Sequence, residues 1–320
     1  MDKKYDIVAL GEVLIDFTPA GRSESGMLLF EQNPGGAPVN MLTAAAKNGF
    51  RTAFIGKVGN DMHGKFLRDT MEAEGIDVEG LVVADDVFTT LAFVALKENG
   101  ERTFSFARKP GADTKLCYKE LNQKIVRAAK VFHVGSLSLT DEPARTTTFQ
   151  AVRMAKESGA LISYDPNYRQ PLWESREEAV ERMRSLLPYV DLLKISDEET
   201  ELLTPYKEPE AAAEYLVKKG IRIVAVTLGA DGVLVATEGK MQRVPGYKSQ
   251  AVDTTGAGDS FWGGFVSEFL RCECAPENLS AEQLERCARF GNATASLCVE
   301  KRGGIPAIPD RKAVEARMQE

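Results

Sequence analysis

The stretch AVDTTGAGDSFWGGF, residues 251–265, combines residue types that could perform acid–base chemistry next to a bound anion. Its Gly-Ala-Gly frees the backbone, and apolar side chains follow at helical spacing, at Phe261, Phe265 and Phe269. Backbone N–H groups at the start of a helix have no intrahelical partner, and the helix dipole is positive there. The pattern therefore predicts an anion-binding loop that opens a helix, with the carboxylate of Asp259 beside it.

Phosphoryl transfer to a hydroxyl is the chemistry that this arrangement predicts. The amides of Gly256, Ala257 and Gly258 would hold the negative charge that grows on the transferred group. Asp259 would accept the proton of the attacking hydroxyl. From spacing alone, an ordinary helix N-cap is an equally good interpretation of Asp259. The chain contains no GxxxxGK[ST] P-loop, and no dinucleotide-binding GxGxxG follows its first apolar segment.

The composition of the whole chain excludes several classes of protein. It has 320 residues, of which 43% are hydrophobic and 27% charged, as is usual for a globular protein with a large core. The net charge of −7 and the lack of a long basic run argue against nucleic acid or an anionic membrane as partner. We also expect no membrane span and no signal peptide, because no apolar run is long enough and the first residues enter a strand-like segment directly.

The cysteines and histidines limit metal and redox chemistry. The five cysteines are odd in number and lack zinc-type CxxC pairs, so we expect reduced thiols and a cytoplasmic location. A metal site at Cys272 and Cys274 is the weaker alternative. The chain has two histidines, His63 and His133, which are too few for a histidine-based metal site or triad.

Short apolar segments alternate with helical patterns along most of the chain. This order predicts an α/β fold with a doubly wound, mostly parallel sheet that has helices on both faces. The expected strands are Ile7–Leu10, Ala53–Val58, Val131–Val134, Leu161–Tyr164, Leu192–Ile195 and Ile223–Thr227. The expected helices include Pro38–Gly49, Lys65–Glu74, Ala144–Glu157 and Glu210–Lys219, several of them followed by a glycine.

Four strand-like segments lack helices between them, and they predict a small separate β-sheet formed by about residues 12–33 and 88–109. Asn99-Gly100 is a strong hairpin signal within the second part. Phe104, Phe106 and Arg108 share one face of a regular strand. We therefore expect a lid on a single domain, residues 1–320; the alternative is a hairpin packed on a core of its own.

Several motifs, in order along nearly the full chain, resemble the PfkB, or ribokinase-like, family of carbohydrate kinases. The matching segments are GEVLIDF (11–17), NPGGAPVNMLTAAAKNG (33–49), IGKVGNDMHGKFL (55–67), KISDEET (194–200), VTLGADGV (226–233), AVDTTGAGDSFWGGF (251–265) and FGNATASLCVEKRGGIPAIP (290–309). The resemblance implies a ribokinase-like fold, ATP as phosphoryl donor and Mg²⁺. It also implies that Asp259 is the catalytic base and that residues 256–258 form the anion hole.

The resemblance places four residues of the N-terminal motifs in the sugar site. Asp16 follows an apolar strand, and its carboxylate can accept two sugar hydroxyls at once, although a solvated strand-end Asp would look the same. Gly35 and Gly36 allow a close backbone approach. Asn40 offers both a donor and an acceptor.

The segment DPNYRQPLW, residues 165–173, is similar to the corresponding segment of fructokinases within this family. Its Arg169 would contact a sugar oxygen or a phosphate. Arg108 matches an arginine that fructokinases share with 2-keto-3-deoxygluconate kinases, but Ala107 stands where many relatives carry Tyr. The resemblance implies a fructokinase, with a 2-keto-3-deoxygluconate kinase or another sugar kinase as the alternative. A sugar or nucleotide sensor without turnover is the alternative from another class.

The later motifs imply the nucleotide and metal sites. In KISDEET, Lys194 would contact the nucleotide, and Glu199 would hold Mg²⁺ through water, although the segment could be a solvated acidic helix start. Relatives often carry Asn where this chain has Ser196. The resemblance places five further residues or groups beside the nucleotide, Thr227, Gly229, Gly232, the glycines of residues 256–258 and, more weakly, Asn292.

Asp253, Thr255 and Gly303 resemble a pair of loops that holds a monovalent cation in many relatives, and their hard oxygen ligands suit K⁺. The expected partners are a small-molecule sugar and ATP, with neither nucleic acid nor membrane. A small lid sheet has exposed edges that often pair, so we also expect a homodimer formed through the lid.

Overall fold

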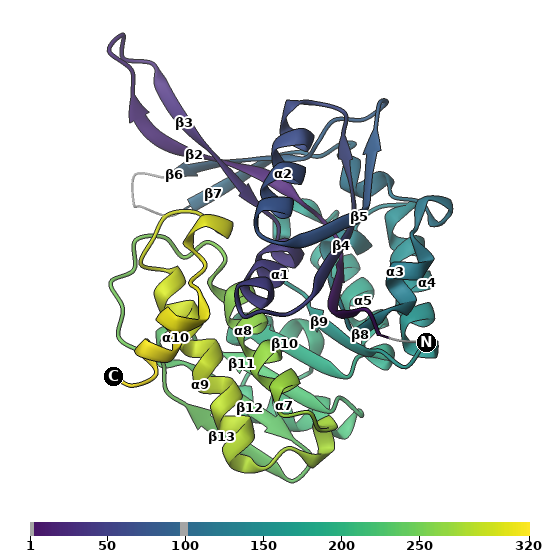
Figure 1. Ribbon diagram of the computed structural model, residues 1–320, viewed down its shortest axis with the longest axis vertical. Coiled ribbons are helices and arrows are strands. Elements are labelled where there is room, and N and C mark those ends of the chain that lie inside the picture. The colour runs from purple at the N-terminus through teal and green to yellow at the C-terminus, as the bar shows by residue number, and fades with distance from the viewer. Residues whose placement is uncertain (1–2, 97–101) are drawn as a thin grey trace.

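The computed structural model describes residues 3–96 and 102–320, and the strands of these residues form two sheets (Figure 1). Within that described part, the large sheet has nine strands in the order β13-β12-β11-β10-β9-β8-β1-β4-β5. Their bounds are β1 Tyr5–Leu10, β4 Thr52–Gly59, β5 Ile76–Ala84, β8 Ala129–Gly135, β9 Leu161–Asp165, β10 Leu192–Ser196, β11 Ile223–Thr227, β12 Val233–Thr237 and β13 Lys240–Val244.

The large sheet is parallel except at one edge. In the strand order given above, every neighbouring pair between β11 and β5 is parallel. The pairs β11–β12 and β12–β13 are antiparallel. Strand β1 lies between β4 and β8, so the chain adds strands first on one side of β1 and then on the other. Every residue of β1 and β4 is buried, as expected for strands covered on both faces. The predicted doubly wound sheet is confirmed.

Helices cover both faces of this sheet, and each set shares one hydrophobic core with it. One face packs against α1 (Ala37–Lys47), α2 (Met62–Ala73), α8 (Ala257–Arg271) and α9 (Ala281–Cys298). The other face packs against α3 (Gln123–Arg127), α4 (Ala144–Glu157), α5 (Arg176–Leu186), α6 (Thr200–Leu203) and α7 (Pro209–Lys218). The last helix, α10 (Arg311–Arg317), packs on α9.

Local signals explain where most helices begin and end. Helix α4 has the predicted bounds and is followed by Gly159, whose φ of 77° favours glycine. Helix α2 begins three residues earlier than predicted, because the side chain of Asp61 caps it by accepting from the amides of His63 and Gly64. The prediction overlooked this cap because His63 and Gly64 do not continue an apolar pattern.

The small sheet contains β2 (Leu14–Arg22), β3 (Leu28–Gly35), β6 (Leu91–Leu96) and β7 (Arg102–Ala107), in the order β3-β2-β6-β7. Two antiparallel hairpins meet through a parallel pairing of β2 with β6. In Figure 1, β2 and β3 project away from the large sheet. The separate small sheet is thus confirmed, while the predicted Asn99-Gly100 turn and the side chain of Phe104 lie outside what the structure describes.

None of the helices within residues 3–96 and 102–320 combines the length and apolar character that crossing a membrane requires.

Candidate active site

A cleft of about 810 Å³ lies where the carboxyl ends of the parallel strands meet the small sheet. In a doubly wound sheet, ligands bind at this edge, close to the strand where the order reverses. Both sheets and α8 contribute to the lining, and Val94 and Phe106 of the small sheet face into it. Fifteen of the nineteen predicted site residues line the cleft: Asp16, Gly36, Asn40, Arg169, Lys194, Glu199, Thr227, Gly229, Asp253, Thr255, Gly256, Ala257, Gly258, Asp259 and Gly303.

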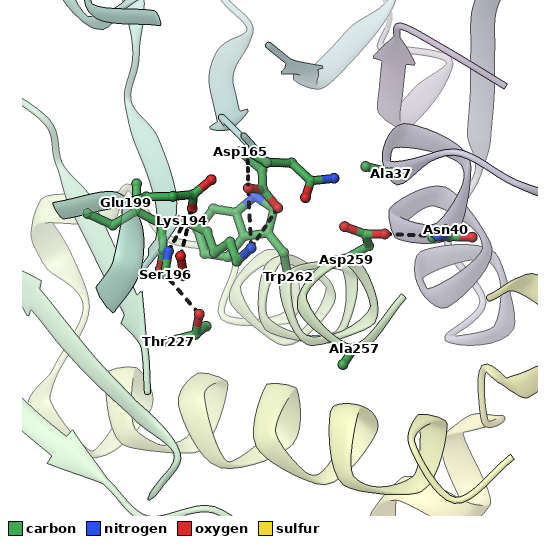
Figure 2. Close-up of polar contacts among 12 residues, drawn as sticks. Ala37, Asn40, Asp165, Lys194, Ser196, Glu199, Thr227, Ala257, Asp259 and Trp262 are labelled. Carbon is green, nitrogen blue, oxygen red and sulfur yellow. Dashed lines mark hydrogen bonds and ion pairs between the residues drawn. The ribbon is translucent and has the colours of Figure 1, made fainter. Parts of the chain in front are cut away.

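Asp259 lies in the first turn of α8 and points toward α1 (Figure 2). The N-cap of α8 is Gly256, whose φ of 76° lies in the left-handed region, and no side chain caps this end. The carboxylate of Asp259 instead accepts a 2.8 Å hydrogen bond from Asn40 Nδ2. The N-cap interpretation of Asp259 is therefore wrong, and its carboxylate is directed into the cleft that it lines.

The surroundings of Asp259 adjust its proton affinity. Burial raises the pKa of Asp259, while Lys194 and the hydrogen bond from Asn40 oppose that shift. A raised pKa makes a carboxylate a stronger base, and the nearby positive charge keeps it ionised. Residue 259 thus combines the two properties that a general base needs.

Lys194 lies in the middle of β10 and forms a buried ion pair with Asp165 at the end of β9 (Figure 2). Its Nζ is 3.0 and 3.2 Å from the two carboxylate oxygens of Asp165. Burial alone would lower the pKa of Lys194, but Asp165, Glu199 and Asp259 raise it overall, so the ammonium stays charged. A Cβ at Gly258 would lie 2.8 Å from this Nζ, so glycine allows a positive charge to approach the anion loop.

The N-terminal motifs meet Asp259 across the cleft. Asp16 lines the cleft from β2, and burial raises its pKa to about 6, with Arg169 opposing. A Cβ at Gly35 would come within 2.7 Å of Asp16 Oδ2, and Gly36 has a φ of 121°. The space that a side chain would fill at these glycines is taken by Asp16 and by the backbone of Glu12. The sequence had suggested that the glycines allow a ligand to approach.

The two predicted arginines differ in their positions. Arg169 lines the cleft. Arg108 is buried outside the lining: it pairs with Asp113 at 2.7 Å and donates to the carbonyl of Leu137 and the hydroxyl of Thr140. Arg108 follows β7 directly, so these contacts fix the base of the small sheet. The carboxylate of Asp113 neutralises the charge of the guanidinium. The sequence did not mark Asp113 as its partner.

Glu199 is buried rather than solvated, which excludes the solvated helix start. One of its carboxylate oxygens accepts from the amide of Tyr168 at 2.7 Å, and the other accepts from the amide and hydroxyl of Ser196. It thus joins β10 to the segment after β9. Because Mg²⁺ is held largely by phosphates and water, an indirect contact of this kind suits it. Within the described residues, no group of three or more His, Cys, Asp or Glu could hold a metal ion directly.

The nucleotide residues divide into two groups. Thr227 and Gly229 line the cleft after β11. Gly232 and Asn292 do not: Gly232 turns the β11–β12 hairpin with a φ of 99°, and Asn292 Nδ2 donates to the carbonyls of Val244 and Pro245. Their positions shape the loop beside the cleft.

The three residues of the predicted cation site come together. Asp253 accepts from the amide of Thr255 at 2.9 Å and from the amide of Gly303 at 3.1 Å. This carboxylate ties the loop before α8 to the loop after α9, and all three residues line the cleft.

Glu12 is a cleft residue that sequence reasoning missed. It is separated from the end of β1 by Gly11, lines the cleft and is only 3% exposed. One of its oxygens accepts from the amide of Ala37 at 3.1 Å, and the other, Oε2, has no hydrogen-bond partner. Its place at the carboxyl end of the strand where the order reverses was the available signal.

Glu12→Gln should stabilise the protein at alkaline pH. Burial raises the pKa of Glu12 from 4.5 to about 7, so the folded state binds the extra proton, and wild-type stability falls as pH rises between these values. Gln carries no charge, so its stability relative to wild type should increase by about 3 kcal/mol between pH 4.5 and 8. Urea unfolding at the two pH values measures this difference. The exposed Glu79→Gln is the control, and an equal effect of Glu12→Gln at both pH values would contradict the assignment.

Comparisons with known proteins agree with this geometry. Residues 4–311 match the model of the pfkB family carbohydrate kinases. The chain is 41% identical over 314 residues to probable fructokinase-2 of Arabidopsis thaliana, covering 96% of this chain and 94% of that protein. Among solved structures, the fructokinase of Xylella fastidiosa with bound ATP has a TM-score of 0.88 at 31% identity and covers 98% of each chain.

A fructokinase double mutant from Vibrio cholerae O395, solved with fructose, ADP and potassium ion bound, also has a TM-score of 0.88, at 32% identity over 99% of each chain. The match covers both sheets and all the segments that line the cleft. The chain therefore belongs to the pfkB family of carbohydrate kinases.

Proposed function

We propose that this protein is an ATP-dependent fructokinase, which transfers the terminal phosphoryl group of ATP to fructose and yields fructose 6-phosphate and ADP. The observation that carries the proposal is the buried carboxylate of Asp259, directed into the cleft at the start of α8. The identity to fructokinases over nearly the whole chain supports fructose as the acceptor.

Asp259 would take the proton of the fructose hydroxyl as that oxygen attacks the phosphoryl group. The bond between the oxygen and phosphorus forms as the bond to the leaving ADP breaks. Asn40 fixes the orientation of the carboxylate through its 2.8 Å hydrogen bond, so the base does not have to reorient during the reaction.

Negative charge on the transferred group would meet the amides of residues 256–258, at the positive end of the α8 dipole, where no side chain caps the helix. The ammonium of Lys194 lies next to Gly258 and is held in place by Asp165. A fixed cation and fixed amides favour a developing anion because they need no rearrangement.

The sugar would lie between Asp16 on β2 and Asp259 on α8, with Asn40 and Arg169 beside it. Thr227 and Gly229 would face the nucleotide, and Gly232 and Asn292 would shape the adjacent loop. Bound Mg²⁺ neutralises phosphate charge in this chemistry, and Glu199 would hold it through water while also fixing the Ser196 loop.

The rival sugar kinase activity is on 2-keto-3-deoxygluconate. That substrate carries a carboxylate, which would need a free cationic side chain. Arg108 is already paired with Asp113, so Arg169 is the remaining predicted arginine that faces the cleft. Because the guanidinium of Arg108 is already paired, the site favours a neutral sugar over a substrate with a carboxylate.

An ADP-release assay with a panel of acceptors tests the proposal. Fructose should give the highest kcat/KM, compared with 2-keto-3-deoxygluconate, ribose, adenosine and no added acceptor. Preference for the keto acid would assign the rival activity. Binding of sugar or ATP without ADP release from any acceptor would assign a sensor and end the kinase proposal.

A K⁺ requirement is a separate expectation of the same site. Asp253 and Gly303 join two loops next to the anion loop, and oxygen-rich sites of this kind suit K⁺. Replacing K⁺ by Na⁺ at constant ionic strength should lower kcat several-fold. Equal rates in the two salts would remove the cation from the proposal.

We propose further that residues 12–33 and 88–109 act as a lid on a single kinase domain, residues 1–320, and that two lids form a homodimer. Val94 and Phe106 of the small sheet face the cleft, so closure would exclude water from it. Exposed apolar side chains gather on β3 and β6: Leu28 (50%), Leu29 (45%), Phe30 (42%) and Phe93 (38%). Such a patch favours a protein partner.

The double variant Leu28→Ser/Phe30→Ser should therefore be monomeric. Light scattering after size exclusion should give twice the chain mass of 35.0 kDa for the wild type and the single mass for the variant. Val83→Ser, which removes an exposed apolar side chain on β5, is the control and should stay dimeric. A monomeric wild type would rule out the dimer.

We also infer a cytoplasmic location, because the five cysteines are all free thiols, as is usual in a reducing compartment.

A further inference from the structure

Three neighbouring strands, β8, β9 and β10, place buried polar side chains on the face of the large sheet that packs against α8. The residues next to them in each strand, for example Phe132, Ile162 and Leu193, belong to the core on the opposite face. Because side chains alternate along a strand, the polar residues share the face that carries α8. They are at most 5% exposed and comprise His133, Ser163, Asp165 and Lys194.

Ser163 is the residue through which this polar row contacts α8. Trp262 Nε1 donates a 2.8 Å hydrogen bond to Ser163 Oγ. The same Oγ lies 2.9 Å from Nδ1 of His133, which is its direct neighbour across β8 and β9. An indole nitrogen only donates, so the direction of the bond from α8 is fixed. Burial lowers the pKa of His133 to about 3, so the imidazole is neutral near neutral pH and the network carries no charge.

The first turn of α8 contacts the same strands at a second point. A Cβ at Gly258 would lie 2.8 Å from Nζ of Lys194, which pairs with Asp165, two residues beyond Ser163 on β9. Residues 258 and 262 are four apart, so they lie on one side of the helix, one turn from each other. A helix held at two such points does not turn about its axis unless one of them breaks.

The direction of the Asp259 carboxylate depends on that rotation. Asp259 lies on α8 between the two points, and its side chain reaches across to Asn40 on α1 (Figure 2). A turn of α8 would therefore change the 2.8 Å distance between Asp259 Oδ2 and Asn40 Nδ2, and with it the direction of the carboxylate in the cleft. A buried polar network that is fully satisfied favours one arrangement of the elements that it joins.

We propose that Ser163 is a positioning residue for phosphoryl transfer: through Trp262 it fixes the rotation of α8 and so the direction of Asp259. Ser163 does not line the cleft, so it has no direct contact with a ligand there. This inference rests on the proposed function, because it takes Asp259 as the base. It separates orientation of the base from binding, so loss of the hydroxyl should lower kcat and leave the KM values for sugar and ATP nearly unchanged.

Ser163→Ala tests this role in the full-length protein. Its kcat for fructose should fall by roughly 10- to 100-fold, because a small misplacement of a reacting group has effects of that size. The matched control is Ser267→Ala, which removes a buried hydroxyl of the same helix that bonds to the carbonyl of Gly263 within α8. It should keep the kcat of the wild type. Both variants are assayed below their thermal unfolding transitions, so that only folded protein is compared.

Trp262→Phe removes the same hydrogen bond from the other side. If the bond is what positions α8, the double variant Ser163→Ala/Trp262→Phe should have a kcat close to that of the weaker single variant, instead of the product of the two losses. Tryptophan emission measures the contact without turnover. The chain has two tryptophans, so Trp173→Phe leaves Trp262 as the reporter. Ser163→Ala in that background should shift the emission to shorter wavelength, because the indole N–H loses its partner.

Four results would overturn the proposal: wild-type kcat in Ser163→Ala, an equal loss in Ser267→Ala, independent losses in the double variant, or an unchanged emission spectrum. A rise in KM without a loss of kcat would also contradict it, because Ser163 would then affect binding. If the wild type uses another acceptor than fructose, fructose is wrong as the substrate and the same comparison with that acceptor still tests Ser163. If no acceptor is turned over, the kinase proposal and this inference both fail.

Discussion

Asp259→Asn should abolish most turnover while the protein stays folded. Asn has the same shape and can still accept the hydrogen bond from Asn40, but it cannot take a proton from the sugar hydroxyl. General-base catalysis contributes about 10²- to 10⁴-fold, so kcat should fall by that factor. Steady-state ADP release at saturating fructose and ATP measures the loss.

The matched control is Asp69→Asn, which removes an exposed carboxylate of α2 outside the cleft and should leave kcat unchanged. Thermal unfolding of Asp259→Asn should show no loss of stability, because burial raises the pKa of this carboxyl and the neutral amide avoids the burial of a charge. Turnover close to that of the wild type would show that another group takes the proton.

Asp16→Ala should produce the second large effect, on the use of the sugar rather than of ATP. A carboxylate that accepts two sugar hydroxyls makes two charge-assisted hydrogen bonds, each contributing about 1.5–3 kcal/mol. Losing both should lower kcat/KM for fructose by roughly 10²- to 10⁴-fold. The KM for ATP should change little, because Asp16 lies on β2 and the predicted ATP residues lie on β10 or later in the chain.

The pH dependence of the wild type provides an independent check of Asp16. Burial raises its pKa to about 6, so protonation should remove both acceptors, and kcat/KM for fructose should fall as pH drops through that value. Asp16→Asn keeps the volume but accepts at one oxygen, and it should lie between wild type and Asp16→Ala. An Asp16→Ala enzyme with the sugar kinetics of the wild type would exclude this residue from the site.

The elements of the fold were largely predictable because their signals are local. The strand Ile223–Thr227 and the helix Ala144–Glu157 have their predicted bounds. Apolar runs, helical spacing and glycines after helices depend on residues that are close together in the chain, so they can be recognised in the sequence. The separate small sheet was predictable for the same reason, since its four strands lack helices between them.

The partners of the site residues were not predictable from local patterns. Asn40 and Asp259, which share a hydrogen bond, are 219 positions apart. Lys194 and Asp165 are 29 positions apart on neighbouring strands. Local sequence patterns contain no signal for such pairs. Arg108 shows the consequence: the family resemblance suggested substrate contact, while the structure pairs it with Asp113.

By itself, the sequence determined the order of strands and helices, the flexible Gly-Ala-Gly at the start of α8 and the acidic residue behind it, because each depends on neighbours along the chain. Only the tertiary structure decided which charges face the cleft and which are neutralised. The sheet order places β1, β8, β9 and β10 side by side, so side chains from distant segments meet at one edge. Burial at that edge then raises the pKa of Glu12, Asp16 and Asp259, because desolvation depends on the surrounding atoms and not on residue type.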